Sequence, residues 1–474
     1  MNKENLLLLT VFVPIAGSFI LPLAGRFSKR LRDLLAFILI AAPFIFSLKL
    51  IPDVLAGKII IVSKTFPLGF NFILSADCLA VFMAAVSSFI SAIIVLYSFD
   101  YISHYENQNE YYLMVALFLG SMMGLVFSAN LIFLYLFWEI TAITSWRLIG
   151  FFREKEFVIK ADKAFLVTVF GALVMLLGFI SIYQQTGSFD LAVIKNTPIS
   201  GLAVLLILFG ILSKSATLPF QTWLPDAGVA PSPVTALLHA AVLVKIGVYV
   251  YARLFVATFT LAQFWHTAVP LIAGISALIS AGAALVETDI KRIIAYSTVS
   301  QIAFIFLGFA VGNQIGVAGA LLYILMHGLA KGGLFLCAGI IEQKTKIRDI
   351  RQLGGLIQTM PLTAIAFLLC SFSIMGIPPF GGFWSKYMVM SGAVTSGHMK
   401  ITVIFLCGAF LTVLYLLRLF NSVFLGELKN VEREGSELMV LCVLILGALS
   451  LLGGIFINYP AQFAQIAVKQ MLGS

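Results

Sequence analysis

Four lysines lie inside stretches of this sequence that are otherwise apolar enough to cross a lipid bilayer. They are Lys214, Lys245, Lys331 and Lys386, and a fifth apolar stretch contains Glu139. A charged side chain near the bilayer centre costs roughly 2.5–3.5 kcal/mol on insertion scales, so such residues usually have a function. Ionisable groups distributed through a helical bundle are what a proton or cation relay requires. The sequence therefore predicts an ion-translocating membrane protein in which these residues form one path.

The composition excludes a soluble globular protein. Of the 474 residues, 61% are hydrophobic and 11% are charged, whereas about 25% of the residues of soluble domains are charged. The net charge of +9 is explained by lysines and arginines gathered in loops on one side of a membrane, so we expect no nucleic-acid partner. The cysteines are scattered through apolar segments without metal-ligand spacing, and no nucleotide-binding motif is present. We therefore expect no metal site and no cofactor.

A window of about 20 residues predicts an all-α polytopic protein with about fourteen transmembrane helices. We take the apolar amino-terminal stretch as the first span. The whole chain, 1–474, is expected to form a single integral membrane domain. Short alternating runs within 52–76 predict an external hairpin. The spans centre near residues 15, 42, 87, 120, 138, 172, 208, 243, 276, 302, 327, 375, 408 and 447.

The loops predict how the chain crosses the cytoplasmic membrane. If the amino terminus lies outside, the inner loops carry most of the loop lysines and arginines, as the positive-inside rule requires. An even number of spans then returns the chain to the same side. Both termini are therefore predicted outside.

Two of the predicted spans are interrupted by proline and glycine. The seventh is broken by Pro219 and Pro225 after Lys214, and the twelfth is broken within 376–382 before Lys386. Proline removes a backbone donor and thereby frees carbonyl groups inside the membrane. Paired broken helices in two halves of a chain indicate a transport site. Proline kinks that serve packing alone remain an alternative.

The order of lysine and break is reversed between these two spans, which is the order that an inverted repeat produces. We expect two inverted five-helix repeats, spans 4–8 and spans 9–13, covering about 111–257 and about 267–426.

Five sequence blocks resemble one known family. It is the family of antiporter-like proton-translocating subunits found in respiratory complex I, in Mrp Na⁺/H⁺ antiporters and in energy-converting membrane hydrogenases. The resemblance follows the order of the family along nearly the whole chain. The blocks are WEITAITSWRLIGF (138–151), SKSATLPFQTWLPDAGVAPSPVTALLHAAVLVKIGVY (213–249), DIKRIIAYSTVSQIAF (289–304), MHGLAKGGLFLCAG (326–339) and GIPPFGGFWSKY (376–387).

The resemblance implies two half-channels joined by a polar axis along the middle of the membrane. It assigns Glu139 and Lys214 to the glutamate–lysine pair of the first half-channel. Lys245 would begin the central axis, Lys331 would continue it, and Lys386 would be the terminal lysine of the second half-channel.

Two histidines are further candidates for a proton relay. His327 precedes Lys331 by one helical turn, so both residues share a helix face. His239 precedes Lys245 by six residues. A structural role in packing remains the alternative for both histidines, and for His239 the two interpretations are evenly balanced.

The proposed Glu139–Lys214 pair has a simple physical basis. A carboxylate about 6 Å from an ammonium group stabilises it by roughly 2.8 kcal/mol at an effective dielectric constant of about 20. Movement of Glu139 would therefore switch Lys214 between holding and releasing a proton. The alternative is that each lysine only snorkels toward water or neutralises a neighbour.

The resemblance leads us to expect the proton-pumping subunit of a redox-driven complex, related to energy-converting hydrogenase or complex I. Its partners would be other membrane subunits and peripheral iron–sulfur subunits. The chain has no catalytic centre of its own and would act within an oxidoreductase complex. A first alternative is an Mrp-type Na⁺/H⁺ antiporter subunit, which would exchange Na⁺ for protons. A second alternative is a membrane scaffold without transport activity.

Alanine at Lys214 or at Lys386 is predicted to abolish coupled ion transport without blocking assembly. Arginine should rescue transport poorly, because a guanidinium group does not release its proton in proteins. Proton uptake by membrane vesicles would be measured, with assembly checked on a native gel. Wild-type transport by both alanine variants would contradict the relay.

Overall fold

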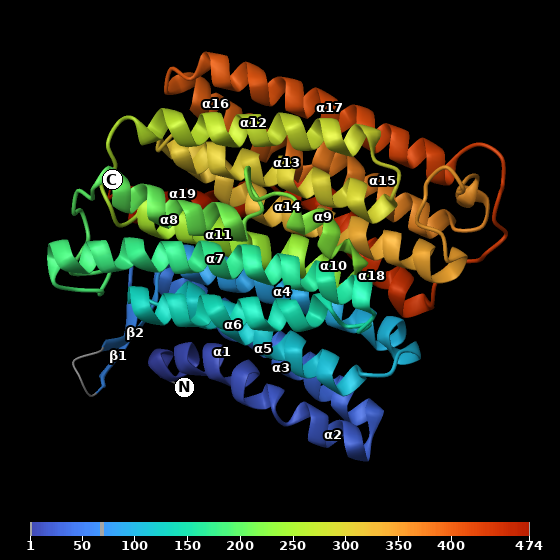
Figure 1. Ribbon diagram of the computed structural model, residues 1–474, viewed down its shortest axis with the longest axis horizontal. Helices are drawn as coiled ribbons and strands as arrows, with labels where there is room; N and C mark the ends of the chain where they lie inside the picture. Colours follow the sequence, from blue (N-terminus) through green and yellow to red (C-terminus); the bar gives the residue numbers. More distant parts are fainter. Residues whose placement is uncertain (1, 67–70, 474) are drawn as a thin grey trace.

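The computed structural model describes residues 2–66 and 71–473, which form a bundle of helices running roughly side by side (Figure 1). The helices of the first half are α1 (Lys3–Ser18), α2 (Leu21–Phe27), α3 (Lys29–Leu55), α4 (Cys78–Tyr101), α5 (Gln108–Phe127), α6 (Leu131–Ile149), α7 (Lys155–Thr186), α8 (Gly201–Lys214), α9 (Trp223–Asp226), α10 (Ser232–Ala236) and α11 (Leu243–Tyr251). The second half contains α12 (Trp265–Val286), α13 (Ile290–Ala310), α14 (Gln314–Thr345), α15 (Pro361–Met375), α16 (Gly381–Thr395), α17 (Met399–Phe424), α18 (Glu437–Ile455) and α19 (Asn458–Leu472).

The predicted all-α, multi-pass membrane architecture is confirmed. Among the described residues, 11 helices are long and apolar enough to cross a membrane, and the pair α1–α2, bent by 48°, makes up to 12. Two shorter apolar helices, α8 and α15, are the helices that the sequence predicted to be broken. Every predicted span centre falls on one of these helices or on the span Ser232–Val256, which includes α10 and α11. The amphipathic helix α19 was not predicted.

A single hairpin accompanies the helices in the described part of the chain. Strands β1 (Ile60–Thr65) and β2 (Asn71–Ala76) pair antiparallel, with Ile60 opposite Ala76 and Thr65 opposite Asn71. The predicted hairpin is therefore present, and residues 67–70 between its strands lie outside the described residues. The hairpin lies toward the same end of the molecule as both chain termini (Figure 1).

The break in the twelfth span follows from the proline chemistry of the sequence. Helix α15 ends at Gly376, whose φ of +82° lies in the left-handed region that favours glycine. The carbonyl of Ile374 would accept a hydrogen bond from residue 378 in a continuous helix, but Pro378 has no N–H group. The break therefore leaves the Ile374 carbonyl free inside the bundle.

The seventh span breaks at a tight turn and not at a missing N–H group, because the N–H of Thr217 bonds to the Leu212 carbonyl. Helix α8 ends at Lys214, and Ala216 adopts a φ of +50°. The indole Nε1 of Trp223 then donates to the carbonyl oxygen of Ser213 at 2.9 Å. Each predicted repeat, 111–257 and 267–426, thus contains one interrupted helix, and the repeat boundaries themselves stay a prediction.

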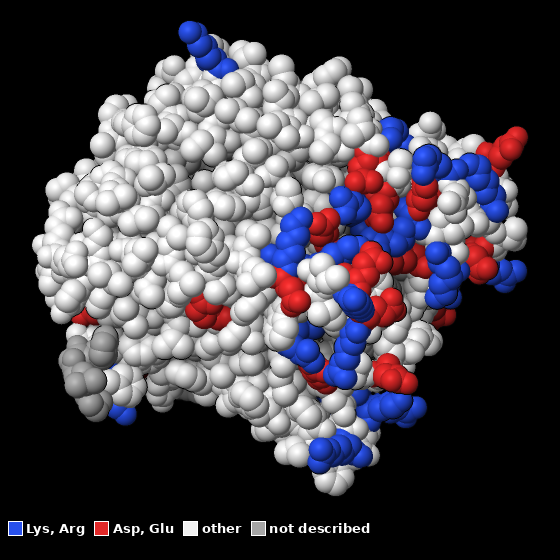
Figure 2. All heavy atoms as spheres, viewed as in Figure 1, with Lys and Arg blue, Asp and Glu red and all other residues white. Residues whose placement is uncertain are grey.

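Charged side chains gather at the end of the molecule opposite the hairpin, on the face shown in Figure 2. Asp226, in the segment after α8, accepts hydrogen bonds from Lys163 on α7 and from Arg292 on α13, each at 2.7 Å. Arg292 also pairs with Glu287 at 2.9 Å. Asp226 is therefore an ionic link between the first and second halves of the chain.

Arg147 belongs to this charged end as well. Both Arg147 and Arg153 pair with Glu110 at the start of α5. Arg147 follows Glu139 on α6 by eight residues, but its charge is directed to the end of the helix and not to the predicted lysine path.

Asp226 is predicted to make the stability of the protein depend on acid pH. Burial opposes ionisation of Asp226, but hydrogen bonds from Lys163 and Arg292 outweigh it and hold the pKa of the carboxyl below its ordinary value. The stabilisation is therefore present above the unfolded-state pKa and is lost as the pH falls through the folded-state pKa. Asp226→Asn should lower the unfolding free energy at neutral pH by roughly 1.5–3 kcal/mol and should flatten the acid dependence.

Thermal unfolding of the purified protein in detergent, measured between neutral and acid pH, checks this prediction. Asp349→Asn is the matched control, because Asp349 pairs with Arg351, an arginine that is 71% exposed. An Asp226→Asn variant with an unchanged acid dependence would contradict the prediction.

Candidate functional site

The four lysines predicted to carry transport are all buried, and each ammonium group donates to a backbone carbonyl of a membrane helix. None of the four forms an ion pair with a carboxylate of the described residues. An unpaired ammonium in an apolar interior is costly, and main-chain oxygens reduce that cost without adding a fixed negative charge. The Nζ–O distances are 3.2 Å for Lys214 to Trp138, 2.8 Å for Lys245 to Ile324, 3.1 Å for Lys331 to Ile294 and 2.6 Å for Lys386 to Ile374.

Glu139 lies beside Lys214 without touching it. Lys214 binds the carbonyl of Trp138, the residue that precedes Glu139, and its Nζ lies 5.3 Å from the centre of the Trp138 ring. One carboxylate oxygen of Glu139 is buried and makes no hydrogen bond to the described residues. The two charges interact electrostatically across this gap. The structure thus brings the predicted pair together through Trp138, which sequence reasoning did not single out.

Lys245 depends on a glycine for its position. A Cβ atom at Gly328 of α14 would lie 2.3 Å from the Lys245 Nζ and 2.5 Å from Cδ1 of Ile90. The absence of a side chain at Gly328 therefore lets the ammonium reach the Ile324 carbonyl. Lys245 lies on α11, directly after a π-helical turn over Leu237–Ala241, and such turns are frequent at functional sites.

Both candidate histidines are fully buried, and neither ring nitrogen of either residue has a hydrogen-bond partner in the described part of the chain. His239 lies in the π-helical turn, with its ring centre 4.4 Å from that of Phe335. His327 lies one residue before Gly328 on α14, with its ring centre 6.0 Å from that of Tyr323. Buried polar groups of this kind are normally hydrogen-bonded by internal water, so the two histidines mark positions where water would complete a polar path.

A chain of side-chain hydrogen bonds extends from Lys331 toward Lys386. Lys331 donates to Ser297 Oγ at 2.5 Å, and Ser297 shares a 2.6 Å hydrogen bond with the hydroxyl of Tyr415. Gln301 contacts this hydroxyl at 3.4 Å and accepts a hydrogen bond of 2.6 Å from Tyr323.

The chain ends beside Lys386. The Lys386 Nζ lies 5.7 Å from the centre of the Tyr323 ring and 4.8 Å from that of Phe304. Sequence reasoning missed the members of this chain between the two lysines. Their signal was present, because Ser297 and Gln301 are spaced by four on α13, and Tyr323 precedes His327 by four on α14.

The predicted site residues form one group and one neighbouring pair. His327 lies within electrostatic reach of Lys245, Lys331, Lys386 and His239. The Glu139–Lys214 pair is connected to this group by close helix packing, since a Cβ at Gly247 of α11 would lie 1.9 Å from the Ser215 hydroxyl. The described residues contain no group of three or more His, Cys, Asp or Glu side chains arranged to hold a metal ion.

Residues 128–412 match the family described as "NADH:quinone oxidoreductase/Mrp antiporter, TM". The match covers more than half of the chain and contains every predicted site residue. The chain belongs to this family.

Curated relatives of this family member are Na⁺/H⁺ antiporter subunits. "Na(+)/H(+) antiporter subunit A1" of Staphylococcus haemolyticus is 34% identical over 98% of this chain and 62% of its own length. The subunit A1 of Staphylococcus aureus is 33% identical over 95% of this chain and 61% of its own length. The chain therefore spans about three fifths of the length of the curated relatives that it matches.

Two solved structures share the membrane-helix fold of this chain. A chain of the "Mrp complex from Dietzia sp. DQ12-45-1b" superposes with a TM-score of 0.90 at 22% identity, covering 100% of this chain and 98% of that one. A chain of the "membrane-bound sulfane sulfur reductase (MBS), an archaeal respiratory membrane complex" superposes with a TM-score of 0.88 at 23% identity, covering 98% and 97%.

These comparisons favour the antiporter function over the redox-driven function. The sequence predicted a subunit of a redox-driven complex, with an Mrp-type antiporter subunit as the alternative. The curated relatives carry the antiporter name, so they support the alternative better than the first choice.

Gly328→Ala is predicted to impair transport by this antiporter-like subunit while leaving assembly intact. The new methyl group would push the Lys245 ammonium away from the Ile324 carbonyl. We expect transport to fall by about tenfold or more, because misplacing a reacting group by about 1 Å costs up to about a hundredfold. Alanine is also the better helix former, so a loss of activity would not reflect helix propensity.

Gly332→Ala is the matched control, one turn further along α14, where a Cβ would meet its nearest neighbour, Leu446, at 3.4 Å. Sodium-dependent proton movement in proteoliposomes compares the two variants. Equal activity of both variants would show that the position of Lys245 does not matter for transport.

Proposed function

We propose that this chain is the proton-translocating subunit of an Mrp-type Na⁺/H⁺ antiporter in the cell membrane. The observation that carries the proposal is the buried set of four lysines, each bound to a main-chain carbonyl and unpaired with a carboxylate of the described residues. Family membership and the name of the curated relatives support the antiporter assignment. Other membrane subunits of a multisubunit complex are the proposed partners.

Protons would move between Lys214 and Lys386 through the middle of the bundle, in either direction. Lys214 would hold or release its proton according to the distance of the Glu139 carboxylate. The proton would then pass Lys245 and, with water, the histidines His239 and His327. None of the four lysines is held in one protonation state by a directly bound carboxylate. A small shift of charge nearby would therefore transfer the proton from a lysine to the next group of the route.

The hydrogen-bond chain between Lys331 and Lys386 supports the second part of this route. The hydroxyl groups of Ser297, Tyr415 and Tyr323 each both donate and accept hydrogen bonds. Ser297 and Tyr415 thus provide a proton path at the Lys331 end, and the amide of Gln301 fixes the position of Tyr323. Protons would leave the path, or enter it, at Lys386.

The charge distribution supports an orientation for the proposed transporter. Lysines and arginines gather together with acidic side chains at the charged end shown in Figure 2. By the positive-inside rule this end would face the cytoplasm. Both chain termini and the hairpin would then face outward, as the sequence predicted.

A redox-driven pump is the second candidate function, because the description of the family includes NADH:quinone oxidoreductases. It would use the same lysines and would require iron–sulfur subunits as partners. A scaffold without transport is the third candidate. Four buried ammonium groups would serve no purpose in a scaffold, since each costs free energy to bury.

Isolation of the native complex in mild detergent, followed by mass spectrometry and reconstitution, tests the proposal. Companion membrane subunits without redox centres, together with a sodium-driven pH change in proteoliposomes, would support the antiporter. Co-purified iron–sulfur subunits and a pH change that needs an electron donor would replace it with the redox-driven pump. The absence of ion movement in both assays would favour the scaffold.

Tyr415→Phe is predicted to slow transport by roughly tenfold, because a positioned proton-transfer group typically contributes 10²–10⁴-fold and water would replace the hydroxyl in part. Tyr111→Phe is the matched control. Tyr111 is equally buried and shares a 2.7 Å hydrogen bond with Ser98, but it lies on α5 away from the lysines. Stopped-flow measurement of proton flux in proteoliposomes compares the two, and equal fluxes would exclude Tyr415 from the path.

A further inference from the structure

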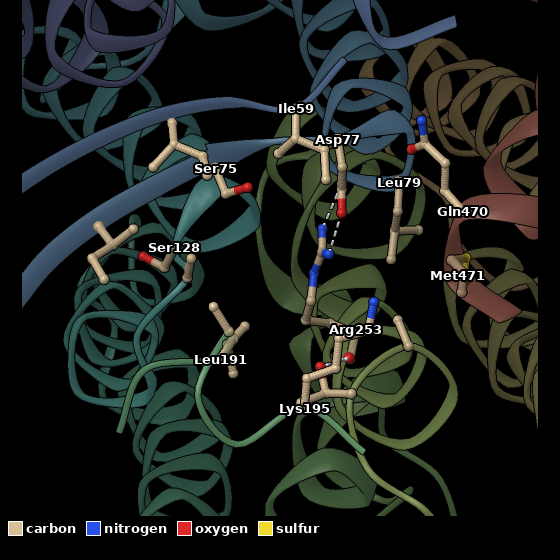
Figure 3. A pocket seen from close by; sticks show the side chains of 16 residues that line it. Ile59, Ser75, Asp77, Leu79, Ser128, Leu191, Lys195, Arg253, Gln470 and Met471 are labelled. Atoms are coloured by element: carbon tan, nitrogen blue, oxygen red, sulfur yellow. Dashed lines mark hydrogen bonds and ion pairs between the residues drawn. The ribbon is translucent and has the colours of Figure 1, made fainter. Parts of the chain in front are cut away.

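A pocket of about 220 Å³ lies near the hairpin, at the end of the molecule that carries both termini. It is formed where the hairpin, the segments after α5, α7 and α11, and helix α19 meet (Figure 3). Its volume accommodates several water molecules. Its lining is partly polar and includes Asp77, Ser128, Arg253, Thr258 and Gln470.

An ion pair between Asp77 and Arg253 forms one wall of this pocket. The guanidinium of Arg253 donates through both terminal nitrogens to the carboxylate of Asp77, with one distance of 2.8 Å (Figure 3). Asp77 also caps the amino terminus of α4 by accepting from the backbone N–H of Ala80 at 2.9 Å. The two side chains are 19% and 12% exposed, so the pair lies at the boundary between the pocket and the interior.

A polar track continues inward from this ion pair to Tyr249, one helical turn from Lys245. The Nε of Arg253 donates to the hydroxyl of Tyr249 at 3.0 Å, and Tyr249 in turn donates to the carbonyl of Val126 on α5. Lys245 and Tyr249 are four residues apart on α11, and Arg253 lies four residues further along, in the π-helical turn Ala252–Val256 that follows α11. At about 1.5 Å per residue, the track covers about 12 Å from Lys245 to Arg253.

We propose that this pocket is an aqueous vestibule through which Lys245 exchanges protons with the solution at the hairpin end, and that the Asp77–Arg253 ion pair closes its inner end. In this conformation Lys245 and Tyr249 are fully buried, so the route is closed. Separation of the ion pair would admit water to Tyr249 and Lys245. The lysine ammonium would then release its proton to that water and remain as a neutral amine.

The vestibule adds a third point of access to the route between Lys214 and Lys386. Its transport role rests on the proposed function, but its accessibility to water does not. A purely structural ion pair between α4 and α11 would need no water-sized space beside it and no line of polar side chains behind it. Here both features adjoin the same arginine.

Thiol labelling tests the vestibule independently of transport. All five cysteines of the assembled protein are first replaced by alanine, and single cysteines are then introduced as Ala257→Cys at the pocket and Lys245→Cys behind the ion pair. The probe is the membrane-impermeant cation 2-(trimethylammonium)ethyl methanethiosulfonate, added separately to each side of oriented vesicles. Because the thiolate is the reactive form, labelling reports access to water.

The Ala257→Cys protein should be labelled from the hairpin side with the ion pair intact. The Lys245→Cys protein should be labelled from that side only after the pair is removed by Arg253→Ala, with a rate increase of about tenfold or more. The double variant Asp77→Asn, Arg253→Gln removes both charges but keeps polar side chains, and it serves where Arg253→Ala does not fold. Arg292→Ala, which removes an ion pair at the charged end, should leave the labelling unchanged.

Three results would overturn the proposal. Unlabelled Ala257→Cys would show that the pocket is dry. Unlabelled Lys245→Cys in both ion-pair variants would show that no route leads inward, and equal labelling with and without the pair would show that the pair is no gate. None of these results depends on whether the complex transports Na⁺, so a failure of the antiporter assignment alone would leave the labelling pattern intact.

Discussion

The arrangement of this protein depends on one recurrent interaction, a buried lysine ammonium bound to a backbone carbonyl of a membrane helix. A carboxylate partner would stabilise each charge more strongly but would also fix it. A carbonyl oxygen accepts one hydrogen bond from the ammonium group and leaves its protonation sensitive to charges farther away, such as Glu139 beside Lys214. The breaks and glycines of the bundle serve this interaction. Pro378 leaves the Ile374 carbonyl free for Lys386, and Gly328 admits Lys245 to Ile324.

Much of the fold was predictable from the sequence because membrane insertion imposes long apolar helices. The span centres, the two interrupted helices and the hairpin all follow from hydropathy, proline chemistry and residue alternation. Helix α19 was not predicted because its polar face lowers its mean hydropathy. The π-helical turn at His239 was not predicted either, since nothing in the sequence LLHAAVLVK distinguishes it from a regular α-helix.

The charged residues of the candidate site were predictable from the sequence, but the hydrogen bonds that connect them were not. An intramembrane lysine is conspicuous against an apolar background, whereas Ser297, Gln301, Tyr323 and Tyr415 are common residue types in membrane helices. Their importance lies in contacts between α13, α14 and α17, which are distant in sequence. The Asp77–Arg253 ion pair could not be predicted for the same reason, since its two residues are 176 positions apart in the sequence. The signal available in the sequence was the spacing of polar residues at intervals of four on one helix, as for Ser297 and Gln301.

The use of main-chain acceptors has a consequence for mutagenesis. Substitution of an amino acid replaces a side chain but leaves the carbonyl in place, so no single codon change deletes the oxygen that holds Lys214, Lys245, Lys331 or Lys386. A screen of random variants would therefore recover the lysines themselves and would miss their acceptors. Genetic evidence for the acceptors would come only through residues that shape the helix path, of which Gly376 is the clearest, since its φ of +82° ends α15 beside the carbonyl that Lys386 binds.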